Sequence, residues 1–328
     1  MHIPDNYLSP QTCAVMGGLM LPVWVIAVKK VKSEVTAKKM PILGISAALS
    51  FLIMMFNIPL PGGTTGHAVG AALVAILLGP WPAVIAVSTA LLIQALLFGD
   101  GGVLAFGANC FNMAFVMPFT GYLIYILITR IAQNEKWKYP AAFLAGYLSI
   151  NIAAFCAAVE FGIQPFFFKD AAGFPLYCPY PLSATIPAMM IPHLLAAGFL
   201  DALITAGVLA FISRVSPELI HADKPFRKRP LYILLGLLAV LTPVGLIASG
   251  TAWGEWGKEE ILKIAGFIPE GMIKGFNFPA LLPDYTVKGL NHVAGYLISA
   301  VFGIAILLIL FKFFSGSKKE KNGRKLDG

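Results

Sequence analysis

Residues 40–99 read MPILGISAALSFLIMMFNIPLPGGTTGHAVGAALVAILLGPWPAVIAVSTALLIQALLFG, sixty positions without a single Asp, Glu, Lys or Arg. A helix needs about 20 apolar residues to cross the roughly 30 Å hydrocarbon core of a bilayer, so this stretch is long enough for several crossings. Its apolar residues form long runs and do not alternate with polar ones, which favours helices over a transmembrane barrel. The stretch therefore predicts an all-α integral membrane protein.

The rest of the chain has the same character, because only 12% of its 328 residues are charged and its mean hydropathy is +0.79. Nine apolar runs predict nine transmembrane helices, at about residues 10–28, 41–57, 66–80, 81–98, 104–128, 140–163, 185–212, 231–249 and 291–313. We expect a seven-helix bundle over residues 1–215, a cytoplasmic linker over 216–230, and a two-helix hairpin over 231–328 with an outer loop and a basic tail.

The basic residues predict how the chain is oriented. Most of the 24 Lys and Arg residues lie in four clusters, over residues 29–39, 130–138, 214–229 and 312–325. With nine spans, all four clusters fall on the same side, which the positive-inside rule makes cytoplasmic. We therefore expect a cell-membrane protein with its N-terminus outside and its C-terminus in the cytoplasm. The net charge of +8 is explained by topology, with no need for a nucleic-acid partner.

The chain begins MHIPD, which places three nitrogens within reach of one cation. They are the α-amine of Met1, the backbone nitrogen of His2 and the His2 ring, and together they can form two fused chelate rings in roughly one plane. This geometry suits Ni(II), Cu(II) or low-spin Co(II) much better than Mg(II) or Ca(II). The terminus lacks the basic region of a signal peptide, so we expect Met1 and His2 to be retained.

A second histidine lies in the predicted outer loop NIPLPGGTTGH, residues 57–67. Prolines stiffen this loop, and glycines allow its backbone to approach another segment closely. By topology, His67 is on the same side as Met1 and His2 and is a candidate for a fourth nitrogen ligand. The hydroxyls of Thr64 and Thr65 are candidates either to tie down the loop backbone or to orient a ligand ring.

The stretches MHIPDNYLSP (residues 1–10) and PGGTTGH (61–67) together resemble the CbiM/NikM family, the substrate-binding components of energy-coupling factor transporters for cobalt and nickel. QALLFGDGG (94–102), GANCFNM (107–113) and PHLL (192–195) agree with it. The resemblance covers residues 1 to about 215 and implies that the Met1 amine, the His2 backbone nitrogen and the rings of His2 and His67 hold the metal. Asn6 stands where the family usually has Gly, and Asn tolerates a left-handed turn.

The resemblance also implies partners: a transmembrane coupling subunit and two cytoplasmic ATPases. The chain has no G-x-x-x-x-G-K-[ST] motif, so we expect it to bind no ATP itself. Its C-terminal hairpin resembles the small two-span accessory subunit that often accompanies the family, although the usual Asp-Pro-Asp-Gly-Leu-Glu motif is missing. The transported substrate is expected to be Co²⁺ or Ni²⁺, and the sequence leaves the choice between them open.

Polar residues inside the predicted spans are further candidates. Asn109 and Asn112 either hydrogen-bond the metal-site loop or join helices to one another. Asp201 either seals a polar contact between helices or takes part in coupling to a partner, and we favour the seal. We expect Glu160 to lie at the membrane interface and His193 to be a packed ring.

His292 is predicted at the outer start of the last span. Of two interpretations, a residue that assists metal capture and a histidine without a role in binding, we favour the second. Rival functions are a proton-coupled secondary metal transporter, which would need several paired intramembrane carboxylates, and a membrane metal sensor without transport. A membrane metalloenzyme is disfavoured, because the residues after His193 lack the base of an H-E-x-x-H motif. We therefore expect a transporter subunit and not an enzyme.

Overall fold

The computed structural model describes residues 1–35, 40–61, 63–217, 228–248 and 250–323. Most of the expected linker and the end of the basic tail lie outside these residues. The α-helices are α1 Pro10–Glu34, α2 Met40–Met54, α3 Ala71–Leu78, α4 Pro80–Ile93, α5 Phe106–Asn109, α6 Met117–Ala132, α7 Lys138–Gly162, α8 Gln164–Phe167, α9 Leu182–Pro192, α10 Gly198–Val215, α11 Arg229–Leu241, α12 Lys258–Ala265, α13 Glu270–Lys274 and α14 His292–Gly323. The π-helical segments are η1 Gln94–Phe98, η2 Cys110–Val116 and η4 His193–Ala197. The 3-10 helices are η3 Glu135–Trp137, η6 Thr242–Ile247 and η7 Pro283–Tyr285. Strands β1 (Ile58–Leu60) and β2 (Thr64–Gly66) form an antiparallel hairpin.

Helices lie at all nine predicted positions, but two are too short to cross a bilayer alone. Within the described residues, seven helical runs are long and apolar enough to do so: Pro10–Glu34, Pro80–Phe98, Phe106–Ala132, Glu135–Phe167, Leu182–Val215, Arg229–Ile247 and His292–Phe314. Helix α2 has 15 residues and α3 has 8. At 1.5 Å per residue, α3 is about 12 Å long, so the prediction of a complete spanning helix over residues 66–80 is wrong.

The segment before α3 is buried but not helical, and a side chain from α10 satisfies its backbone. Asp201 Oδ1 accepts the N–H groups of Val69 and Gly70 at 2.8 and 2.9 Å, and Ser50 Oγ donates to the Val69 carbonyl at 2.8 Å. Buried backbone without such partners is costly in an apolar environment. Asp201 therefore makes the irregular stretch before α3 possible, which is the sealing role that we favoured for it.

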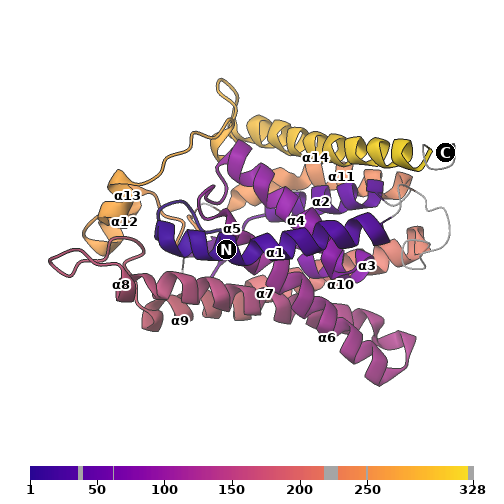
Figure 1. Cartoon of the computed structure of the whole chain (residues 1–328), viewed down its shortest axis with the longest axis horizontal. Coiled ribbons are helices and arrows are strands. Elements are labelled where there is room, and N and C mark those ends of the chain that lie inside the picture. The colour runs from indigo at the N-terminus through magenta and orange to yellow at the C-terminus, as the bar shows by residue number, and fades with distance from the viewer. Residues whose placement is uncertain (36–39, 62, 218–227, 249, 324–328) are drawn as a thin grey trace.

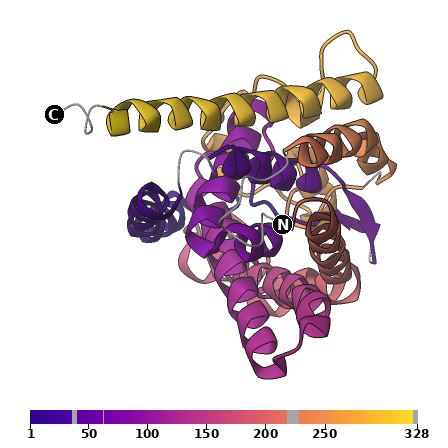
Figure 2. The ribbon, with the colours of Figure 1, turned by 90° about the vertical axis from the view of Figure 1, so that its right-hand side faces the viewer.

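The long helices of the bundle run along the longest axis of the molecule, with α12 and α13 at one end and the last turns of α14 at the other (Figure 1). When α1 is seen end-on, α14 runs across the view, so α14 lies at a steep angle to α1 (Figure 2). Glycines allow α14 to approach α2 closely, because Gly303 faces the ring of Phe51 and Gly44 faces the side chain of Phe311. Small residues at such crossings are typical of helix packing in membranes.

The loop between η6 and α14 folds back over the N-terminal segment of the chain. Tyr7 Oη donates to the carbonyl oxygen of Trp256 at 2.8 Å, and the Leu282 N–H donates to the carbonyl oxygen of Leu97 at 2.7 Å. The Gly271 N–H donates to the backbone between α8 and α9. The C-terminal part of the chain thus covers the end of the bundle where the chain begins.

Candidate metal site

The first three residues lie inside the protein, although a free terminus usually frays. The exposed fractions of Met1, His2 and Ile3 are 4%, 2% and 0%. Asn109 holds both backbone groups of Ile3, since its Oδ1 accepts the Ile3 N–H at 2.8 Å and its Nδ2 donates to the Ile3 oxygen at 3.0 Å. The Gly102 N–H donates to the same oxygen at 2.8 Å. These bonds fix the terminus in place without using the nitrogens of Met1 and His2.

Asp5 attaches the N-terminal segment to the loop before α5. Its carboxylate accepts the N–H of Val103 at 3.1 Å and that of Leu104 at 2.7 Å. Gly102 lies so close to the Asp5 backbone that a Cβ there would clash. The chain then turns at Asn6, whose φ of 70° lies in the left-handed region, as the sequence allowed. The strand-like terminus is therefore held at two points, Ile3 and Asp5.

His67 and His2 meet at the buried terminus. The Nε2 atom of His67 lies 3.2 Å from Nδ1 of His2, and the two ring centroids are 4.9 Å apart. His67 Nδ1 lies 2.9 Å from the carbonyl oxygen of Ala68. A carbonyl can only accept, so Nδ1 carries the proton and Nε2 keeps its lone pair. This is the arrangement that orients a metal-ligating histidine.

Two carboxylates face the nitrogens of the terminal motif. The Met1 amine donates to Glu255 Oε1 at 3.0 Å, and Asp100 Oδ1 lies 2.9 Å from His2 Nδ1. Tyr285 Oη donates to the other Asp100 oxygen at 2.5 Å. Burial raises the pKa of the Asp100 carboxyl, but the charge and hydrogen bond of His2 oppose this and hold the pKa below its usual range. Negative charge thus surrounds a site composed of nitrogens.

The donor set is unusual because half of it comes from the backbone. Among the residues that the structure describes, no group of three or more His, Cys, Asp and Glu side chains is placed to hold a metal ion. The amine of Met1, the amide nitrogen of His2 and the two imidazoles offer four nitrogens instead. Nitrogen donors suit Ni(II), Cu(II) and Co(II) and disfavour Mg(II) and Ca(II).

The two threonines of the loop contact the C-terminal part of the chain. Thr64 Oγ1 accepts the N–H of Trp253 at 2.8 Å and donates to the Thr65 carbonyl oxygen at 3.4 Å. Neither hydroxyl is hydrogen-bonded to His67 within the described part of the chain. Thr64 thus ties the β1–β2 hairpin to the loop that covers it.

Asn112 lies one helical turn beyond Asn109 and has a different partner. Its Nδ2 donates to Glu160 Oε2 at 2.8 Å, which joins η2 to α7. Glu160 is 6% exposed and lies near the end of α7, where its side chain faces the protein interior. Hydropathy locates a residue along a helix but says little about which side of the helix faces the protein. Of the two asparagines, Asn109 is the one whose hydrogen bonds in the described residues join the N-terminal segment.

The other two histidine candidates, His193 and His292, differ in their burial. His193 is 6% exposed and begins the π-helical turn η4, next to a pocket that also contacts Met1. His292 is exposed at the start of α14. The structure therefore brings His193, but not His292, close to the terminal site.

Sequence reasoning missed three acidic residues at this site: Asp5, Asp100 and Glu255. Asp100 had a usable signal, because it is the first charged residue after the sixty-residue uncharged stretch and follows a predicted outer span end. Asp5 lies inside the terminal motif itself. Glu255 had no signal in the sequence, since it is 254 positions from its partner Met1.

Known proteins resemble this chain over nearly its whole length. Residues 2–219 match the family described as cobalt uptake substrate-specific transmembrane region, and residues 227–317 match the PDGLE domain. A probable fused nickel transport protein, LarMN, of Lactiplantibacillus plantarum is 50% identical over 95% of this chain and 97% of its own length. The fused nickel transport protein NikMN of Rhodobacter capsulatus is 47% identical over 94% of this chain and 95% of its own length.

A solved structure agrees with these relatives. The crystal structure of a truncated transition metal transporter is 54% identical, with a TM-score of 0.62, and is matched over 65% of this chain and 98% of that one. Together with the seven long apolar helices, this confirms the expected all-α, multi-pass membrane fold. The match of residues 227–317 to the PDGLE domain confirms that the chain carries a C-terminal extension beyond the first family match.

Proposed function

This chain belongs to the cobalt uptake substrate-specific transmembrane family, and from that membership and its site we propose that it is the substrate-binding membrane component of an ATP-driven uptake system for nickel or cobalt ions. The fused relatives in Lactiplantibacillus plantarum and Rhodobacter capsulatus, both named for nickel transport, support nickel as the first substrate to test. Energy would come from partner subunits, because the chain itself has no P-loop motif.

One observation carries the proposal: the ligand nitrogens of His2 and His67 are 3.2 Å apart in the protein interior. Metal–nitrogen bonds are about 2.0–2.1 Å long, so two ligands at right angles around one ion lie about 2.9 Å apart. The observed spacing is close to that of adjacent ligands in a plane. The amine and amide of the first two residues supply the other two corners.

The acidic residues explain how a dication is accommodated. Glu255 and Asp100 hydrogen-bond the Met1 amine and the His2 ring, and when the ion replaces the protons there, the same carboxylates offset its charge. Binding requires ligands that have lost their protons, so affinity falls as the pH is lowered. The ligand type excludes Mg(II) and Ca(II), but does not by itself reject Cu(II), which heads the affinity series.

We assign the transporter an outer N-terminus and a cytoplasmic C-terminus. The site lies toward the end of the bundle that α12 and α13 cover, while the last turns of α14 and the basic end of α1 lie at the other end (Figure 1). Basic ends favour the cytoplasm. A coupling subunit and two ATPases would act from that side and drive the rearrangement that releases metal into the cell. The fused C-terminal part would replace a separate accessory subunit.

The energy source is tested by uptake in cells that express this chain with its coupling and ATPase partners. Substitution of the P-loop lysine in both ATPases is expected to reduce accumulation of Ni(II) or Co(II) to the level of cells without the chain. Metal accumulation is measured by mass spectrometry of washed cells. Full uptake with inactive ATPases would instead favour a proton-coupled carrier, and metal binding without any uptake would favour a sensor.

The fourth ligand is tested by His67→Gln in the purified chain. A glutamine cannot supply the lone pair of Nε2, so we expect binding about tenfold or more weaker for Ni(II), measured by isothermal titration calorimetry, and loss of the absorbance of a planar four-nitrogen Ni(II) complex. His292→Gln is the matched control, because His292 is exposed at the start of α14, whereas Met1, His2 and His67 are buried. Equal affinities for the two variants would remove His67 from the site.

A further inference from the structure

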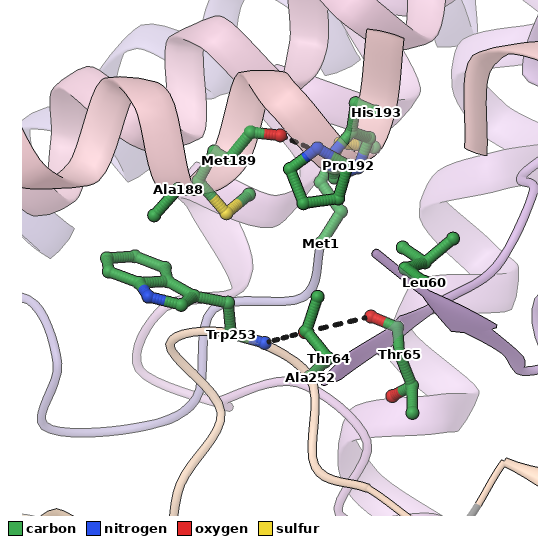
Figure 3. A pocket seen from close by; sticks show the side chains of 10 residues that line it. All are labelled: Met1, Leu60, Thr64, Thr65, Ala188, Met189, Pro192, His193, Ala252 and Trp253. Carbon is green, nitrogen blue, oxygen red and sulfur yellow. Dashed lines mark hydrogen bonds between the residues drawn. The ribbon is translucent and has the colours of Figure 1, made fainter. Parts of the chain in front are cut away.

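A small pocket lies next to the terminal site, on the side of Met1 that faces α9 (Figure 3). The side chains of Met1, Met189 and His193 line it, together with Thr64 from the β1–β2 hairpin and Trp253 from the C-terminal loop. Met1 is shared, because its amine belongs to the nitrogen site and its side chain lines the pocket. A molecule or ion in the pocket therefore contacts a residue that also supplies one of the proposed ligand nitrogens.

The His193 ring is held in the form that ligates metals. Its Nδ1 lies 2.7 Å from the carbonyl oxygen of Met189, and since a carbonyl only accepts, Nδ1 carries the proton. The lone pair is then on Nε2. No described residue forms a hydrogen bond with Nε2. Nε2 is also not one of the fully buried side-chain atoms that lack a hydrogen-bond partner. A backbone acceptor on the distal nitrogen is how proteins orient ligand histidines.

The backbone around His193 is also specialised. Pro192 precedes it within the helical run, and residues His193–Ala197 form the π-helical turn η4 between α9 and α10. Such turns are rare and are frequent at functional sites. The turn places the His193 imidazole against the same pocket that Met189 of α9 lines (Figure 3).

Besides the hydroxyls of Thr64 and Thr65, the pocket is lined by the sulfur atoms of two methionines. Met1 and Met189 are 4% and 3% exposed, and both line the space next to His193. Imidazole and thioether donors select borderline and soft transition metals and have little attraction for Mg(II) or Ca(II). One imidazole with two weak thioether donors makes a weaker site than four nitrogens, as a transit site requires.

The pocket reaches the surface on its other side. Thr64 and Trp253 are partly exposed, whereas Met1, Met189 and His193 are buried. Two residues beyond Trp253, the Glu255 side chain is 22% exposed and bears a negative charge. An acidic group beside an opening raises the local concentration of cations.

We propose that this pocket is a capture site for a divalent transition-metal ion, in which His193 Nε2, with the thioethers of Met1 and Met189, holds the ion before it passes to the nitrogens of Met1, His2 and His67. The proposal rests on the function proposed above. It assigns His193 a role in the rate of metal entry and not in the final affinity.

The test is stopped-flow mixing of NiCl₂ with the purified full chain, following the absorbance of the planar Ni(II) complex. For His193→Gln we expect the second-order rate constant to fall about tenfold, while the final absorbance and spectrum equal those of the parent. Met189→Leu removes the sulfur and keeps the volume, and is expected to slow entry about threefold. His292→Gln, an exposed histidine outside the pocket, is expected to leave the rate unchanged.

The outcomes separate the two proposals. Rates equal to the parent in both His193→Gln and Met189→Leu, with a normal final spectrum, would overturn the capture site and leave the nitrogen site intact. A parent chain without the planar spectrum would overturn the proposed function itself. If His193→Gln fails to fold, the rate for Met189→Leu decides, because that substitution is nearly isosteric.

Discussion

Insertion of two alanines between Met1 and His2 is expected to weaken Ni(II) or Co(II) binding by three orders of magnitude or more. The chelate depends on the amine and the His2 ring being joined through a single backbone nitrogen. Two residues are inserted because a histidine at position three can still chelate with the amine through two intervening amides.

The insertion leaves the anchors of the segment unchanged, which makes its result interpretable. Ile3 keeps its bonds to Asn109, and Asp5 keeps those to Val103 and Leu104. We therefore expect thermal unfolding within a few degrees of the parent, measured in the same detergent as the calorimetric titration. The same two alanines inserted after the exposed Gly289 serve as the control and should not affect binding. A metal affinity within threefold of the parent would exclude the amine from the ligands.

The second large effect is expected for Asp5→Ala, which removes an anchor and no ligand. Without the carboxylate, the N–H groups of Val103 and Leu104 lose their partners, and each unsatisfied group costs about 1–3 kcal/mol. We expect a loss of about 2–4 kcal/mol in the free energy of unfolding. Metal affinity should fall tenfold or more, because a released terminus occupies the competent position only part of the time.

Asp170→Ala is the matched control for Asp5→Ala. Asp170 Oδ1 also accepts two backbone N–H groups, from Ala172 at 2.9 Å and Phe174 at 2.8 Å, but in an exposed turn. Water can replace those bonds, so Asp170→Ala should lower the free energy of unfolding by less than about 1 kcal/mol. Both variants are compared by thermal unfolding and by Ni(II) titration. Equal shifts for the two aspartates, with parent-like metal affinity, would show that Asp5 does not position the site.

The sequence predicted most of the membrane helices because a long uncharged apolar run has few alternatives to a spanning helix. It failed at α3, where apolar residues such as Ala68 and Val69 are equally compatible with a buried irregular segment. The deciding partner is Asp201, which is more than a hundred residues away. Local hydropathy contains no information about such a bond.

For the site, the sequence brought Met1, His2 and His67 into one hypothesis through topology and family resemblance, and the structure places them together. The charges around them were not predictable in the same way. Glu255 belongs to a motif, Trp-Gly-Glu-Trp, that reads as an interfacial anchor, yet Trp253 packs against Phe161 at a ring distance of 5.9 Å. Only the fold shows that this loop covers the terminus.

The ion pair between Met1 and Glu255 also sets an order of assembly. The two residues are 254 positions apart, so during synthesis the amine emerges long before its carboxylate partner exists. A nascent chain that already contains Met1, His2 and His67 still lacks the loop that closes over them. Completion of the C-terminal part is then the last step in maturation of the site, and truncated products of translation would expose an unshielded N-terminal chelator.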